Sequence, residues 1–142
     1  DYAGYLQVDA VNSVEGEAIR WVIGVLRNLA TVRDNAVDLI QQTVVPALAL
    51  QFLETTTNEL SLWSRDSLED SCLMLTVNLV QSCPAEYQKL IDRDTARKAL
   101  GKIHGKGGIH DMRATAVLRL LEEETESLRA AVARQDEKKE FR

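Results

Sequence analysis

The stretch from Glu17 to Thr31, EAIRWVIGVLRNLAT, decides the fold of this chain. Its apolar residues cover more than half of a helical circumference, which predicts a long helix over about residues 14–31 that is covered on more than one side. Arg20 and Arg27 are seven residues apart and share one face. We expect that face to be the one that meets water.

The ending of this helix, Leu26-Arg27-Asn28-Leu29, recurs twice downstream. Residues 76–79 read Thr-Val-Asn-Leu, and residues 117–120 read Val-Leu-Arg-Leu. The anchor positions 28, 78 and 119 are therefore 50 and 41 residues apart, close to the period of about 40 residues that is typical of helical repeats. The excess in the first interval falls in residues 55–66, which we interpret as a polar linker.

The chain as a whole predicts an all-α domain. No segment alternates as a strand does, and two prolines with seven glycines leave room for long helices. We expect helices in the order long, short, medium, long, short, medium, long, with Asp94-Thr95 capping the second medium one. The long helices are expected at about 14–31, 67–82 and 110–128. A helical repeat domain would then cover 1–128, followed by a charged helical tail over 129–142.

Composition narrows the class of protein. A net charge of −5 argues against general nucleic-acid binding, and no apolar run is long enough to span a membrane. The two cysteines lack CxxC spacing, which indicates free thiols in a reducing compartment, so we expect a cytoplasmic or nuclear location. The chain opens at Asp1 without a Met, which suggests a piece of a longer protein.

Candidate chemical sites are few. Gly105-Lys106-Gly107-Gly108, between His104 and His110, lacks the spacing of a phosphate-binding loop and is expected to be an inter-helix loop. No metal-ligand spacing and no nucleophile with a base is legible. The sequence therefore predicts a non-catalytic protein without a cofactor or a metal.

Charge is unevenly distributed along the chain. Residues 89–119 carry eight basic and three acidic side chains. This segment could meet an acidic partner, or it could pair internally with the Glu122–Glu126 cluster.

The segments 21–30 and 44–48 together resemble an armadillo repeat. In that family a third helix ends in small-Leu-x-Asn-Leu-small, and a later helix starts with apolar-Pro-x-Leu, as Val45-Pro46-Ala47-Leu48 does here. The resemblance implies a right-handed α-solenoid of two to three helix triplets. It also implies that the third helices line a groove for an extended peptide, whose backbone would be bound by Asn28 and Asn78.

Two features qualify this resemblance. The Trp that importin-α-type grooves place four residues before the Asn is absent, because positions 24, 74 and 115 are Gly, Met and Thr. A receptor for nuclear localisation signals is therefore not expected. The amides of Asn28 and Asn78 could also bond neighbouring backbone instead of a ligand.

The sequence thus predicts a protein–protein interaction scaffold or adaptor that binds a protein or peptide along its long helices. The alternative is a structural capping or self-assembly region of a larger helical-repeat protein. Candidate contact residues are Arg20, Trp21, Arg27, Asn28, Met74, Asn78 and Arg119.

Overall fold

The computed structural model describes residues 14–55 and 62–140, and all of its regular secondary structure is helical. The predicted all-α class and the predicted order of long, short and medium helices are confirmed for these residues. The helices are α2 (Val14–Leu29), α3 (Arg33–Gln42), α4 (Val45–Thr55), α5 (Leu62–Ser82), α6 (Pro84–Leu90), α7 (Arg93–Leu100) and α8 (Gly108–Glu140).

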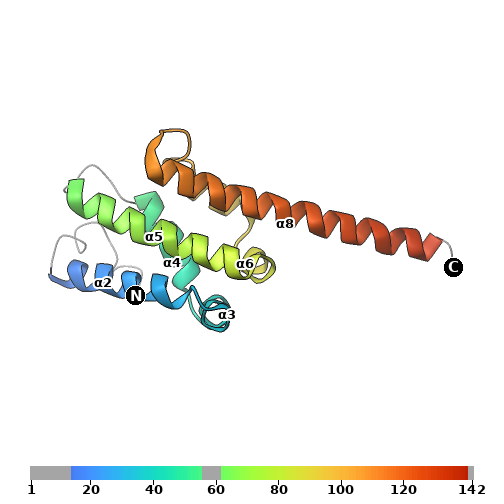
Figure 1. Ribbon diagram of the computed structural model, residues 1–142, viewed down its shortest axis with the longest axis horizontal. Helices are drawn as coiled ribbons and strands as arrows, with labels where there is room; N and C mark the ends of the chain where they lie inside the picture. The colour runs from blue at the N-terminus through green and yellow to red at the C-terminus, as the bar shows by residue number, and fades with distance from the viewer. Residues whose placement is uncertain (1–13, 56–61, 141–142) are drawn as a thin grey trace.

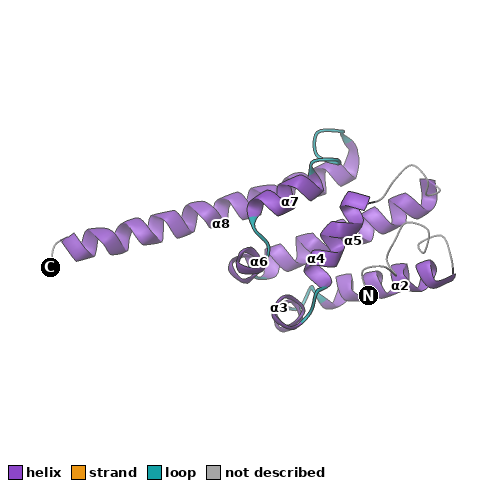
Figure 2. Cartoon of the chain, turned by 180° about the vertical axis from the view of Figure 1, so that it is seen from behind, coloured by secondary structure: helices purple, strands orange, loops and turns teal. Residues whose placement is uncertain are grey.

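The long helix α5 is the centre of the packing. It contacts α2 on one side and α8 on the other, and the three run in the same direction (Figures 1 and 2). The medium helices α4 and α7 contact each other behind this row, with α4 against α5 and α7 against α8. The short helices α3 and α6 also contact each other. Each helix after α4 therefore lies beside the helix that precedes it by three in the chain.

The hydrophobic core is built around α5. Seven of its side chains are buried, and they point to several sides of the helix because α2, α4 and α8 each cover part of it. They are Leu68, Cys72, Leu73, Leu75, Thr76, Leu79 and Val80. The buried Thr76 hydroxyl donates to the Cys72 carbonyl at 2.9 Å, which satisfies the one polar group among them.

Both cysteines are free, as the sequence predicts, and both are buried. Burial raises the pKa of the Cys72 thiol well above its ordinary value, with a further contribution from the Glu69 carboxylate. Cys72 therefore acts as a small core residue with no thiolate at neutral pH.

Several predicted boundaries are wrong. Helix α5 begins at Leu62, inside the expected linker, because residues 62–82 contain no Gly or Pro to delay it. Residues 56–61 of that linker lie outside the described residues. The cap of α7 is Asp92, whose Oδ1 accepts the Thr95 N–H at 2.7 Å, and not Asp94.

Helix α8 begins two residues before the expected start, and the predicted helical tail is helical over residues 129–140. The helix starts at Gly108 and continues without a break to Glu140, so the predicted tail is its direct continuation, which extends away from the other helices (Figure 1). Residues 126–139 of this extension are exposed at every position.

Membrane spans are recognised by the length and apolar composition of a helix. None of the described helices is long and apolar enough to cross a membrane alone, although residues 33–42 and 45–54 together are, as a pair bent by 80°.

Candidate protein-binding surface

The end of α2 is held by two side chains of α5. The Asn78 amide Nδ2 donates to the Arg27 carbonyl at 2.9 Å, and the Ser82 hydroxyl contacts the Ala30 carbonyl at 3.3 Å. Carbonyls in the last turn of a helix have no partner within the helix, so these contacts supply donors that α2 lacks. Asn78 and Ser82 are four residues apart and therefore lie on one side of α5. Asn78 thus bonds neighbouring backbone, one of the two alternatives that the sequence left open.

A chain of charges links the three long helices. The Asp70 carboxylate on α5 pairs with Arg27 of α2 at 3.6 Å, and on its other side it pairs with Arg113 of α8. Beside it, His110 Nδ1 lies 3.2 Å from the Glu69 carboxylate. All five side chains are partly buried, so the network is screened less than an ordinary surface pair.

The partly accessible residues of α5 include Glu69, Ser71, Val77 and Ser82, and four others follow one side of the helix. Asp70, Met74 and Asn78 are half-buried and Gln81 is exposed, at spacings of four, four and three residues. We call these four residues the α5 stripe. Because α2 and α8 flank α5 in parallel, the stripe lies between two long helices. A ligand on it could contact all three.

The orientation of α2 contradicts the sequence interpretation. Arg20 and Arg27 are half-buried, and Arg27 faces Asp70 of α5. The opposite side of the helix is open: Trp21 is 77% exposed, and Val22 and Val25 are each 56% exposed. The expected wet face is thus the one packed beside α5, and an apolar face meets water instead. The apolar residues of α2 are spread around most of the helix, so their positions in the sequence do not show which side packs against α5.

The predicted contact residues other than Arg20 lie in three places. Arg27, Met74 and Asn78 lie together at the α5 stripe and the α2 side that faces it. Trp21 belongs to the open apolar side of α2, and Asn28 is exposed at the end of that helix, where its carbonyl accepts the Thr31 hydroxyl at 2.7 Å.

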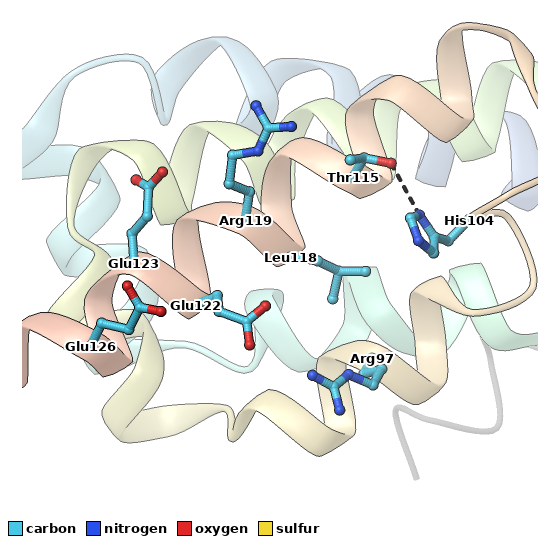
Figure 3. Close-up of a pocket in the computed structure, with 8 residues that line it drawn as sticks. All are labelled: Arg97, His104, Thr115, Leu118, Arg119, Glu122, Glu123 and Glu126. Atoms are coloured by element: carbon cyan, nitrogen blue, oxygen red, sulfur yellow. Dashed lines mark hydrogen bonds between the residues drawn. The ribbon is translucent and has the colours of Figure 1, made fainter. Parts of the chain in front are cut away.

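Arg119 is apart from these residues. It borders a hollow of about 510 Å³ between α7 and α8 (Figure 3). Arg97 and His104 lie at one end of this hollow and three glutamates at the other, Glu122, Glu123 and Glu126. The His104 ring contacts the Thr115 hydroxyl at 3.0 Å. The hollow is open and of mixed charge, and nothing in its lining selects one class of ligand.

Part of the basic segment pairs internally. Arg93 contacts Glu122 at 3.1 Å, which joins α7 to α8, and Lys98 lies 3.9 Å from Glu54 of α4. Arg93 therefore follows the second alternative from the sequence, pairing with the glutamate cluster. These pairs are largely exposed and contribute little to stability.

The glycine-rich loop before α8 holds a carboxylate of its own chain. Gly105, Gly107 and Gly108 have positive φ angles, and the N–H groups of Gly105 and Gly107 each donate to Asp111 at 2.8 Å. These two bonds lower the pKa of the Asp111 carboxyl. A phosphate would meet that negative charge, so the expected role as an inter-helix loop is the one the geometry supports.

The sequence interpretation missed Asp70, Arg113 and the His110–Glu69 pair. The sequence did mark two of these residues, because Glu69 and Asp70 are the only acidic residues in the mostly apolar segment from Leu68 to Val80. The sequence alone does not show their partners, which lie on helices about 40 residues away in either direction along the chain. No group of three or more potential metal ligands occurs among the described residues.

Comparison with protein-family models, with curated proteins and with solved structures finds no significant match to this chain.

Proposed function

We propose that this chain is a non-catalytic scaffold of the armadillo type, a right-handed α-solenoid that binds a protein or peptide along its long helices. The order of helix lengths supports this proposal. The contacts of α3 with α6, α4 with α7, and α5 with both α2 and α8 support it as well, since a solenoid stacks equivalent helices of successive repeats.

The observation that carries the proposal is the α5 stripe. Over the 12 residues from Asp70 to Gln81 of the central helix, Asp70, Met74, Asn78 and Gln81 remain at least partly accessible between two parallel helices. An apolar thioether among carboxylate and amide groups suits an extended peptide, whose side chains and backbone require both kinds of contact.

The role of the asparagines changes in this proposal. Asn78 uses one amide N–H to bond α2, so its amide oxygen and its second N–H are the parts available to a ligand. Asn28 is exposed and keeps both its donor and its acceptor groups as candidates. Arg119 lies at the α7–α8 hollow and is left out of this surface.

A peptide-display library selected against the purified chain tests the proposal. For peptides that bind, Met74→Glu is expected to weaken affinity about tenfold or more, because it places a charge in the stripe. Lys98→Glu on α7, whose side chain is 83% exposed, is the matched control and should leave affinity unchanged. Circular dichroism confirms that both variants fold. Peptides that bind equally well to both variants would place the binding surface elsewhere.

The open apolar side of α2 favours a second candidate function, a capping or self-assembly region. Large contiguous apolar patches on a protein surface often mark interaction sites. This candidate concerns a different surface from the α5 stripe, so one chain could have both functions.

A further inference from the structure

Helix α2 exposes an apolar seam with the spacing of a helix–helix interface. Between residues 18 and 29 the exposed positions are Ala18, Trp21, Val22, Val25, Asn28 and Leu29. Four of them, Ala18, Val22, Val25 and Leu29, follow one another at intervals of four, three and four residues. Val32, 54% exposed in the following turn, continues the series. We call these five residues the α2 seam, and Trp21 lies directly beside it.

This spacing is the one by which two helices pack along their length. Inside the domain, α5 occupies the other side of α2. On the seam side, α2 forms the edge of the row of long helices, and the described part of the chain places no helix there (Figures 1 and 2). The polar side of α2 is turned inward to Asp70 while its apolar side meets water. An ordinary surface helix has the reverse arrangement.

We infer that the α2 seam binds the same seam of a second copy of this chain, with the two α2 helices antiparallel. The inference deepens the assembly function proposed above and does not depend on the α5 stripe. It rests on the self-complementarity of the seam. With a two-fold axis near position 23.5, Val22 faces Val25 of the other copy, and the small Ala18 faces the larger Leu29.

The area available agrees with a modest dimer. Trp21 exposes 77% of its surface, and a Trp side chain covers about 150–250 Å². With the seam residues this gives on the order of 500 Å² of apolar surface per copy, near the upper range of patches on ordinary monomers. Two such patches bury about 1,000 Å², the lower end for biological interfaces. We therefore expect a reversible dimer with a dissociation constant in the micromolar range.

Analytical ultracentrifugation of the full chain over a hundredfold concentration range tests for the dimer. Val25→Glu is expected to raise the dissociation constant about tenfold or more, because a carboxylate would be buried in the seam. The matched control is Leu128→Glu, at an apolar residue of α8 that is 50% exposed. It should dimerise like the unmodified chain. A chain that stays monomeric throughout, or a dimer lost with Leu128→Glu and kept with Val25→Glu, would overturn the inference.

Cysteine cross-linking tests the orientation. Both native cysteines are buried, so an introduced surface cysteine is the reactive one. Under mild oxidation a mixture of Ala18→Cys and Leu29→Cys chains should form disulfide-linked heterodimers. Leu29→Cys alone should not, because in an antiparallel pair its two copies lie about 16 Å apart. Efficient linking of Leu29→Cys to itself would indicate parallel helices and contradict the proposed geometry. A failure here leaves the peptide-binding test of the α5 stripe unaffected.

Discussion

Asn78 offers a direct test of how the long helices are held together. Its amide donates to the Arg27 carbonyl at 2.9 Å, from a part-buried position. Asn78→Ala removes the donor and leaves that carbonyl to whatever water can reach it. A hydrogen bond of this kind contributes about 0.5–1.5 kcal/mol net. Because the site is only partly buried, we expect a loss near the middle of that range, about 1 kcal/mol.

The size of the domain converts this loss into a melting shift. Unfolding entropy is about 2.1 cal/mol/K per residue near 60 °C, or about 0.3 kcal/mol/K for a chain of this length. A loss of about 1 kcal/mol therefore lowers Tm by about 3 °C. Thermal melts followed by circular dichroism resolve such a change, and urea melts with an unchanged m-value would show that the native structure is kept.

Two controls separate this bond from general effects of the substitution. Asn28→Ala changes the same residue type at an exposed position of α2 and should stay within about 0.5 kcal/mol of the unmodified chain. Asn78→Asp places a carboxylate opposite a carbonyl. At pH 7 it should destabilise more than Asn78→Ala, and it should recover toward pH 4, where the protonated carboxyl can donate again.

The reasoning would be refuted by equal melting temperatures of the Asn78→Ala and Asn28→Ala variants. The bond to α2 would then contribute nothing measurable to the free energy of unfolding. A larger loss in the Asn28 variant would likewise show that the end of α2 is held in another way.

Four further predictions concern the core, the loop and the tail. Leu75→Ala, at a fully buried position of α5, should cost about 2–5 kcal/mol in urea melts, whereas Met112→Ala, 72% exposed, should stay within about 0.5 kcal/mol. Tyr87→Phe should raise Tm slightly, because the buried Tyr87 hydroxyl has no hydrogen-bond partner in the described structure and its removal relieves that cost. The folded pKa of Asp111 is lowered from 3.8, so its stabilising contribution is present above that value and is lost as pH falls through the lower folded pKa. Asp111→Asn should therefore destabilise at pH 7 and show a flatter acid limb in a series of melts. Removing residues 127–142 should leave Tm unchanged, because the α8 extension is exposed and a helix of this length without tertiary contacts is marginal, and limited trypsin digestion should cut first at Arg129 or Arg134.

The helix order could be predicted because its signals are local. Pro46 and Pro84 occupy first turns of α4 and α6, and the glycines near residue 105 separate α7 from α8. Proline and glycine affect the backbone only within a few residues of themselves, so the helix boundaries that they set can be predicted from one sequence.

The start of α5 was harder to predict, because no Gly or Pro marks the boundary at Leu62. Where Gly and Pro are absent, polar composition resembles a linker or a tail even when the chain stays helical. The charged stretch after Leu121 has no breaker residue, and α8 continues through it to Glu140. The sequence predicted a charged helical tail here, and in the structure that tail forms one unbroken helix with the rest of α8.

The contacts of the candidate surface depend on atoms that the sequence does not distinguish. The partner of Asn78 is a backbone carbonyl 51 positions away, and every residue carries such a group. Asp70 lies between two arginines from different helices, and several basic residues could have taken either place. The pattern therefore identified Asn78 and Arg27 as notable residues, but it could not reveal that they bind each other.

The two edges of the row of long helices differ in a way that bears on assembly. On α8, the exposed positions from 109 to 126 are Ile109, Met112, Arg119, Glu122, Glu123 and Glu126. Four of these six are charged, so covering that edge would require their desolvation. On α2, five of the six exposed positions from 18 to 29 are apolar. Burying the apolar residues of the α2 edge therefore favours a contact there, whereas burying the charged residues of the α8 edge opposes one. Head-to-tail stacking, which would press the two edges together, is disfavoured relative to a two-fold pairing of α2 with itself.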